Sequence, residues 1–326
     1  IGAISMNVDG TVKIDNSKCI SCGACVYQCP FGALSDKSFI LDAIKMLKNC
    51  DRVYAVVAPA IVSQFTYAKP GQVITAIKAL GFCDVLEAAL GADMVAYNEA
   101  AELAERGFLT SSCCPAFVSY IRKSFPELQE NISHNMSPMA TIAKRIKEKD
   151  PEAKTVFIGP CTAKKGEFQL PEVHKYVDCV LTFEELQAMF DSRELDVGAM
   201  EETVLNNASG YGRIFAHCGG LAEAAAEALK EQGIDFELKP LSCNGIEECK
   251  LALMKAARGK LDANFVEGMA CVGGCVNGAG CMTHNERNRV KVDAHSQQAQ
   301  LKSITDSLLY AAEIDRELKE KAGDKA

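Results

Sequence analysis

The chain has 326 residues, of which 48% are hydrophobic and 24% charged, a composition typical of a globular protein large enough for two or three cores. Its net charge of -8 comes from 43 acidic and 35 basic side chains without long runs of either sign, so we expect no nucleic-acid partner. No apolar run is long enough for a membrane helix and no basic-then-apolar leader opens the sequence, which predicts a cytoplasmic protein without a membrane partner.

Residues 1–50 are turn-rich and contain the run CISCGACVYQCP, which has the form C-x2-C-x2-C-x3-C-P. Closely spaced thiolates in this pattern wrap a 4Fe-4S cluster, whereas zinc sites commonly use two cysteine pairs separated by a longer segment. We therefore predict a small ferredoxin-like α+β domain over residues 1–50. Its cluster ligands are predicted to be Cys19, Cys22, Cys25 and Cys29.

A short repeat leaves the fourth ligand of this cluster open. The segment FGALS at 31–35 follows Cys29 and a proline, and the chain itself begins IGAIS. Two-cluster ferredoxins are duplicated, and the cysteine before the proline serves the other cluster. Unless the repeat is a coincidence, it predicts that the domain is truncated at its N-terminus. The fourth ligand is then Cys29, Cys50 or a missing upstream cysteine.

From residue 51 onward, apolar strands alternate with amphipathic helices, which predicts an α/β domain over residues 51–326 with mostly parallel sheets. Helices are expected at 138–148, 183–191 and 220–232, and the last 25 or so residues are expected to form a solvated helix. Strands are expected at 53–57, 84–86, 155–158, 179–181 and 212–216. Cys161 follows one of these strands, at the end where parallel sheets carry their functional loops.

Three further segments contain cysteines and glycines: TSSCCPAF at 110–117, GPCTAKKGE at 159–167 and EGMACVGGCVNGAG at 267–280. None of them is a zinc or ferredoxin motif alone. Together they supply Cys114, Cys161, Cys271 and Cys275, which suit a four-thiolate cluster assembled from distant loops. The glycines allow the backbone to approach such a cluster and to donate amides to its sulfurs.

In this order, the three segments resemble the signature motifs of the [FeFe]-hydrogenase catalytic domain, over a stretch from about Val53 to the end. The resemblance implies two lobes with mostly parallel sheets flanked by helices. It also implies an H-cluster, in which the four cysteines hold a 4Fe-4S cubane and Cys275 bridges to a two-iron unit carrying CO, cyanide and azadithiolate. The implied activity is the reversible interconversion of protons and electrons with molecular hydrogen. Ferredoxin or another redox protein would be the electron partner, and hydrogenase maturation proteins would supply the two-iron unit.

The resemblance also assigns roles to single residues. Lys164, Met269, Ala58 and Pro59 would hold the two-iron unit, with Glu167 as the positioning partner of Lys164. Cys113 would hand protons to the cluster, on a route that continues through Glu99, Ser133 and Glu102. Without the resemblance, Cys113 would be assigned to packing and the two glutamates, at i and i+3, to a helix surface.

Three positions and one short segment depart from the family pattern and keep other functions open. Phe117 replaces the usual tryptophan, Gly159 the methionine, and Met139 a glutamine, while residues 277–281 read NGAGC instead of GGGQP. The alternatives are a hydrogen-sensing or low-turnover relative and a non-catalytic hydrogenase-like iron-sulfur protein of the assembly type. Proteins of that last type usually lose the adjacent cysteine pair, which this chain keeps. The unassigned cysteines are expected to be buried small hydrophobes: Cys50, Cys83, Cys179, Cys218, Cys243, Cys249 and Cys281.

Overall fold

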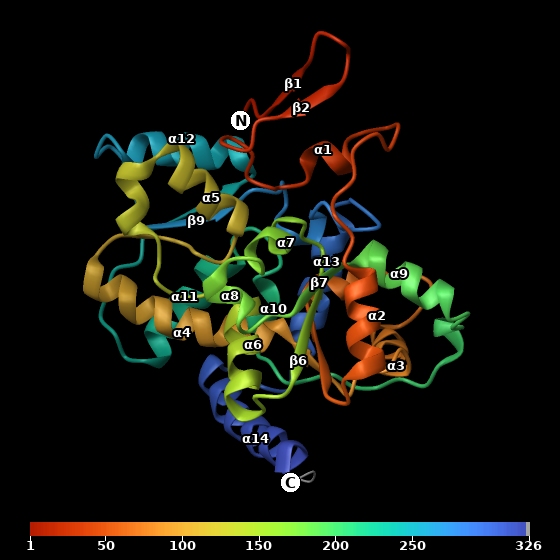
Figure 1. Cartoon of the computed structure of the whole chain (residues 1–326). Coiled ribbons are helices and arrows are strands. Elements are labelled where there is room, and N and C mark those ends of the chain that lie inside the picture. The colour runs from red at the N-terminus through yellow and green to blue at the C-terminus, as the bar shows by residue number, and fades with distance from the viewer. Residues whose placement is uncertain (324–326) are drawn as a thin grey trace.

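The first of two parallel sheets forms the core of one lobe. The computed structural model describes residues 1–323, and its four-stranded sheet has the order β4-β3-β6-β7. Figure 1 labels β6 and β7 of this sheet. The central strands, β3 and β6, pair in register from Val53 opposite Lys154 to Val57 opposite Ile158. The bounds of the strands are Val53–Val57 for β3, Asp84–Glu87 for β4, Lys154–Gly159 for β6 and Cys179–Thr182 for β7.

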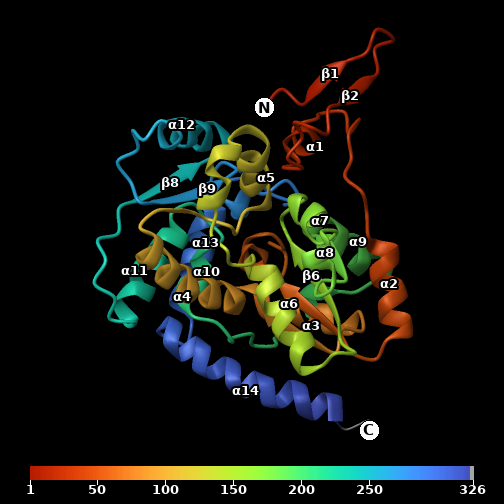
Figure 2. The ribbon, with the colours of Figure 1, turned by 60° about the vertical axis from the view of Figure 1, so that its left-hand side comes forward.

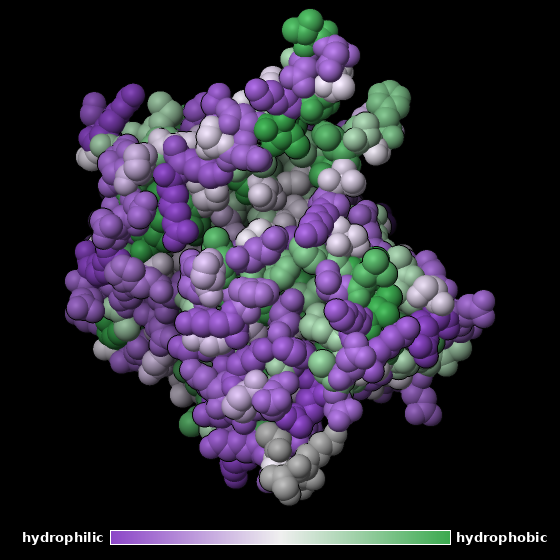
Figure 3. Space-filling view, in the orientation of Figure 1, coloured by the Kyte–Doolittle hydropathy of each residue, from purple (hydrophilic) through white to green (hydrophobic). Residues whose placement is uncertain are grey.

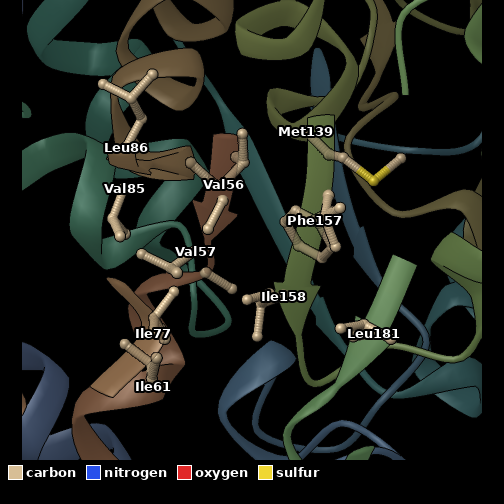
Figure 4. Close-up of a cluster of buried hydrophobic side chains, with 14 of the residues drawn as sticks. Val56, Val57, Ile61, Ile77, Val85, Leu86, Met139, Phe157, Ile158 and Leu181 are labelled. Atoms are coloured by element: carbon tan, nitrogen blue, oxygen red, sulfur yellow. The ribbon is translucent and has the colours of Figure 1, made fainter. Parts of the chain in front are cut away.

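Helices cover this sheet and bury its apolar side chains. Figure 4 shows Val56 and Val57 of β3 packing with Phe157 and Ile158 of β6. All five residues of β3 are buried, as a strand covered on both faces requires. The surrounding helices are α2 (Ile40–Asn49), α3 (Pro70–Ala79), α6 (Pro138–Lys149) and α9 (Phe183–Ser192).

The second lobe contains a three-stranded parallel sheet of order β5-β9-β8. Phe265 and Val266 of its central strand are fully buried, and they join two further apolar clusters. The strands are β5 (Leu109–Thr110), β8 (Pro240–Asn244) and β9 (Phe265–Met269), and the helices of this lobe are α5 (Pro115–Ser124), α11 (Gly220–Glu231) and α12 (Ile246–Ala256).

The long helix α4 (Ala88–Arg106) joins the two lobes, because it packs against α6 of the first and α11 of the second. Two glycines allow neighbouring helices to approach α4 closely. A Cβ on Gly91 would lie 2.2 Å from the Pro138 carbonyl oxygen, and one on Gly212 would lie 2.2 Å from that of Ala89. The helices α10 (Gly210–Ile214) and α14 (Ile304–Gly323) also pack on α4, and Figure 2 shows α14 running along the base of the molecule.

The N-terminal segment lies above the two lobes as a projecting antiparallel hairpin followed by a cysteine-rich turn (Figure 2). The hairpin consists of β1 (Ile4–Met6) and β2 (Val12–Ile14), and all six of its strand residues are exposed. Several of them are apolar, and Figure 3 shows hydrophobic surface interspersed with hydrophilic surface on this projecting segment at the top of the molecule. A single helical turn, α1 (Ala24–Tyr27), follows the first two cysteines of the run and contains the third, Cys25.

Short helical segments occupy the connections and the approach to the C-terminus. They are η1 (Pro59–Ser63), η2 (Pro126–Asn131), α7 (Ala163–Glu167), α8 (Pro171–His174), η3 (Val197–Ala199), η4 (Cys275–Asn277) and α13 (Arg287–Gln297). Within residues 1–323, no helix is both long enough and apolar enough to cross a membrane.

The predicted α/β class with parallel sheets is confirmed, and four of the five predicted strands form. The strand expected at 212–216 is wrong, because this segment belongs mostly to α10. Ser209 caps that helix by accepting a hydrogen bond from the Gly212 amide, and its hydroxyl donates to buried Asp93. The three predicted helices form as α6, α9 and α11.

Two other expectations need correction. The C-terminal helix is amphipathic rather than wholly solvated, since Ala311, Ile314 and Leu318 are buried. Of the seven unassigned cysteines, four are buried: Cys179, Cys243, Cys249 and Cys281. Cys50 and Cys218 are half-buried, and Cys83 is exposed at the start of β4, so packing alone does not describe these three.

Candidate active site

The cysteine segments converge because they follow the carboxyl ends of strands in both parallel sheets. The loop after β5 carries Cys113 and Cys114, the loop after β6 carries Cys161, and the loop after β9 carries Cys271 and Cys275. Parallel strands place these ends at one edge of a sheet, and the two lobes turn their edges toward each other. All five cysteines line one cavity of about 90 Å³.

The shape of this cavity suits a bulky cluster better than a single ion. Among residues 1–323, no three His, Cys, Asp or Glu side chains are close enough together to hold one metal ion. The thiols instead surround a space that is otherwise lined mainly by small apolar residues. Gly273 and Gly274 have φ values of 85° and 89°, which turn the chain tightly between Cys271 and Cys275. Four thiolates around such a space fit a cubane iron-sulfur cluster.

Burial makes the thiols of this cavity costly to ionise in the metal-free protein. It raises the pKa of Cys161 to about 11, and it raises the pKa of Cys271 and Cys275 above their ordinary values as well. Iron binds thiolates, so insertion of a cluster must expel these protons.

Lys164 is the one charged side chain in the cavity lining described here. Its side chain is only 9% exposed and its Nζ lies 2.7 Å from Glu167 Oε2, while the same nitrogen donates to the Cys113 carbonyl oxygen at 3.3 Å. Burial opposes the charge, but the Glu167 carboxylate outweighs it and raises the pKa of Lys164. Glu167 thus has the positioning geometry that the sequence predicted for it.

The other predicted cofactor contacts also line the cavity. Ala58 and Pro59 follow β3, and Met269 ends β9. Met139, at the first turn of α6, lines the cavity where the family pattern has a glutamine. Gly159 has no room for a larger side chain, because a Cβ there would lie 2.5 Å from the Phe157 ring.

The first motif (residues 110–117) and the third (267–280) pack against each other through an aromatic contact. A Cβ on Gly268 would lie 2.4 Å from three ring atoms of Phe117, so the ring rests directly on the glycine backbone. Phe117 is fully buried. The ring that replaces the usual tryptophan therefore helps to hold Cys114 and Cys271 at their positions in the cavity.

The predicted proton route leads from this cavity toward the surface. Burial raises the pKa of Glu99 to about 8 against the opposing effect of the Ser133 hydroxyl, and neither Glu99 oxygen has a hydrogen-bond partner of good geometry in the described structure. Ser133 Oγ donates to Glu102 Oε2 at 3.1 Å. Burial raises the pKa of the Cys113 thiol, and ionisation of Glu99 would raise it further. Cys113, Glu99, Ser133 and Glu102 thus interact in this order, as a row, and their role in proton transfer stays a prediction.

Three partners of Glu102 were not predicted from the sequence. Arg106 and His134 each place a nitrogen 3.0 Å from Glu102 Oε1, and Asn135 Nδ2 donates to Oε2 at 3.0 Å. Arg106 could have been found, since it lies at i+4 from Glu102 on the same helix. His134 and Asn135 carry no such signal, because a loop brings them to α4.

The N-terminal cysteines surround a second cavity, of about 480 Å³. Cys19, Cys22 and Cys25 line it, whereas Cys29 and Cys50 do not. Cys29 Sγ accepts a hydrogen bond from the Ala33 amide, and backbone amides of residues 31–34 lower the pKa of its thiol. Cys22 lines this cavity and the catalytic cavity alike, so the two cluster sites adjoin.

The repeat in the sequence is also a repeat in conformation. Gly2 of IGAIS and Gly32 of FGALS have φ values of 64° and 61°, and both segments supply residues to the N-terminal cavity. A chance similarity of five residues would not predict the same left-handed turn at the same position. The two segments therefore share this turn.

The N-terminal segment is fastened to the catalytic lobes beside the ligand loops. Thr162, next to Cys161, donates its hydroxyl to the Ser21 carbonyl oxygen at 3.1 Å. A Cβ on Gly23 would lie 2.3 Å from the Thr162 hydroxyl oxygen, so only glycine permits this approach. Lys123 of α5 donates to the carbonyl oxygens of Asn16 and Cys19. These contacts hold the N-terminal cavity against the catalytic one.

Comparison with known proteins agrees with this arrangement. Residues 51–279 match the family described as "Iron only hydrogenase large subunit, C-terminal domain", and residues 12–35 match a "4Fe-4S binding domain". The chain is therefore a member of the iron-only, or [FeFe], hydrogenase family. It is 30% identical to Iron hydrogenase 1 from Clostridium pasteurianum over 92% of its own length and 68% of that protein.

The fold is that of solved [FeFe]-hydrogenases. A variant of the enzyme HydA1 from Chlamydomonas reinhardtii superposes with a TM-score of 0.70 at 21% identity, covering 85% of this chain and 94% of the other. A shorter match is to a protein of iron-sulfur cluster assembly. It is 38% identical to the cytosolic Fe-S cluster assembly factor NAR1 from Kluyveromyces lactis over 28% of this chain and 19% of that protein.

Proposed function

We propose that this chain interconverts two protons and two electrons with one molecule of hydrogen at an H-cluster. The observation that carries the proposal is one cavity lined by five cysteines and by a single buried cation, Lys164. The five cysteines are Cys113, Cys114, Cys161, Cys271 and Cys275. Cys114, Cys161, Cys271 and Cys275 would hold the cubane, with Cys275 as the bridge to the two-iron unit. When bound, that unit supplies the open iron coordination and the basic amine at which hydrogen is made or split.

The protein's own residues would anchor the two-iron unit and move protons to and from it. Lys164 offers an ammonium donor to the cyanide ligands and is held in place by Glu167. Ala58, Pro59 and Met269 shape the apolar wall that keeps water from the site. Cys113 would exchange protons with the amine and recover them through Glu99, Ser133 and Glu102.

Electrons would enter through the N-terminal 4Fe-4S site, which adjoins the catalytic cavity at Cys22. Ferredoxin or another redox protein is the proposed external partner. The two-iron unit carries ligands that no side chain can make, so hydrogenase maturation proteins are proposed as further partners. We propose the cytoplasm as the place where these proteins meet.

An infrared spectrum of the maturated protein tests this proposal directly. CO and cyanide stretching bands should appear together with hydrogen evolution from a reduced dye. Protein reconstituted with iron and sulfide alone should contain cubane iron but show neither bands nor hydrogen evolution. Activity in that second sample would refute the proposed cofactor.

The second candidate is a non-catalytic iron-sulfur protein, favoured by the similarity to NAR1. Such a protein would keep the cubane after maturation but gain no CO or cyanide bands. The adjacent Cys113 and Cys114 favour the enzyme, because the first lies beside Glu99 and serves no purpose in holding a cubane. A hydrogen-sensing relative would show the bands with slow turnover, so the measured rate separates it from a bulk catalyst.

A further inference from the structure

His134 lies at the outer end of the row formed by Cys113, Glu99, Ser133 and Glu102. Its Nδ1 is 3.0 Å from Glu102 Oε1, and its backbone amide donates to the same carboxylate at 3.1 Å. The imidazole is 73% exposed, whereas the Glu102 side chain is only 14% exposed. The ring therefore stands between a nearly enclosed carboxylate and solvent.

The other groups that contact Glu102 cannot exchange protons with water near neutral pH. Arg106 offers N–H donors but no acceptor atom, and the amide of Asn135 neither gains nor loses a proton. Ser133 can pass a proton onward, but it is only 4% exposed, and its hydroxyl already donates to Glu102 and accepts from Asn135. Imidazole is the side chain that binds and releases protons in this range.

The surroundings of His134 give water ready access to the ring. The residue lines a surface groove of about 750 Å³, together with the hydroxyls of Ser112, Ser133 and Ser137. Such a polar groove can hold water molecules that bring protons to the exposed edge of the imidazole. The route of protons from solvent to Glu102 is therefore open at His134.

We propose that His134 is the proton-entry residue of this protein. This proposal rests on the proposed function, because the row can transfer protons only if the buried site consumes or produces them. Water protonates Nε2, and the imidazolium formed then releases the Nδ1 proton to Glu102 Oε1. The remaining proton on Nε2 returns to Nδ1 through exchange with solvent, so that the ring begins each cycle in the same form. Hydrogen oxidation uses the same steps in reverse.

The charges around His134 come from five elements. Glu102 and Arg106 of α4 contact each other at 3.0 Å, so their opposite charges largely offset one another at the ring. Arg106 also donates to the carbonyl oxygen of Glu130 on η2. The remaining charged residues lining the groove are Arg122 and Lys123 of α5, Glu167 of α7 and Glu172 of α8.

The variant His134→Gln tests the proposal in the maturated enzyme. Glutamine can still donate a hydrogen bond to Glu102 but cannot carry a proton, so the hydrogen evolution rate should fall about tenfold in weakly buffered solution. Added imidazole should restore most of the loss by replacing the missing ring. His174→Gln is the matched control, because His174 is exposed on α8 and has no contact with Glu102. A full rate in His134→Gln without added imidazole would overturn the proposal.

A second measurement uses the metal-free protein and does not depend on hydrogenase activity. In a histidine-labelled sample, the ¹⁵N chemical shift of His134 Nδ1 should move when Glu102 is changed to Gln, since the charged acceptor of its hydrogen bond is removed. The His174 signals should stay in place. An unchanged His134 signal would overturn the proposal even in an active enzyme. Absent CO and cyanide bands would instead overturn the proposed function and leave this contact intact.

Discussion

Glu99 allows the proton route to be tested in the metal-free protein through its stability. Its side chain is 1% exposed, and burial raises its pKa from the ordinary 4.5 to about 8. The folded protein therefore keeps a proton that the unfolded chain has already released. The change Glu99→Gln replaces this carboxyl with a neutral group of nearly the same shape, which removes the titration from both states.

The sign and size of the effect follow from the two pKa values. Between pH 4.5 and pH 8 the folded state binds more protons at Glu99 than the unfolded state, so the free energy of unfolding falls as pH rises. A difference of one bound proton lowers the free energy of unfolding by about 1.4 kcal/mol per pH unit, and because the difference is smaller near both pKa values, the loss between pH 5 and pH 8 is about 3 kcal/mol. In Glu99→Gln, the free energy of unfolding should not show this fall between pH 5 and pH 8. Burying the glutamine amide costs about 1 to 3 kcal/mol, but that cost is the same at both pH values.

Urea unfolding of the metal-free protein at pH 5 and pH 8 measures the difference. Glu105→Gln is the control, because Glu105 is exposed on the same helix. The wild type and the control should lose about 3 kcal/mol more than Glu99→Gln between the two pH values. An equal loss in all three proteins would show that Glu99 is already ionised in the folded state. The proton-holding role of this residue would then be wrong.

Three further predictions concern the ligands, a buried ion pair and the second motif. Cys114→Ala should lose the iron of the catalytic cubane. Cys113→Ala should keep that iron while turnover falls by about 10² to 10⁴, and Cys113→Asp should recover part of the turnover. Loss of iron in Cys113→Ala would reverse the assignment within the pair. Glu87→Gln should lower the free energy of unfolding by about 3 to 5 kcal/mol, because it leaves the fully buried Arg213 without its carboxylate at 2.8 Å, and an unchanged urea midpoint would contradict this. Gly159→Met should destabilise by about 1 to 3 kcal/mol, because its Cβ would meet the Phe157 ring at 2.5 Å. Adding Phe157→Ala should recover part of that loss, and strictly additive effects would show that the ring is not what excludes the methionine.

The first sheet was predictable because its central strands are nearly continuous apolar runs. Residues 53–57 and 155–158 leave few other ways to bury so many branched and aromatic side chains. The second sheet was missed. Its edge strand β8 begins with a proline and is largely exposed, and β9 carries buried Glu267 and a glycine. Glu267 accepts amide hydrogen bonds from Gly219 and Ala222 at the start of α11, a compensation that only the folded chain shows.

Much of the candidate site could be predicted because its cysteines and lysine occur in short motifs. The placement of Ser133 followed from the same resemblance, and the structure puts it beside Glu102. His134 could not be found in this way. It is the next residue in the chain, yet its contact with Glu102 depends on how residues 132–135 pass over the end of α4. Tertiary contacts of this kind leave no periodic signal in the sequence.

The buried charges of the catalytic cavity suggest an order of events during cluster insertion. Burial raises the pKa values of Cys161, Cys271 and Cys275, so the metal-free cavity contains neutral thiols. Lys164 keeps its ammonium because Glu167 stabilises it there. Lys164 is thus the charged group of the cavity lining that faces these thiols, and it remains when an anionic cluster replaces the thiol protons. The same cation then faces the negative ligands of the two-iron unit, so one lysine can favour both loading steps.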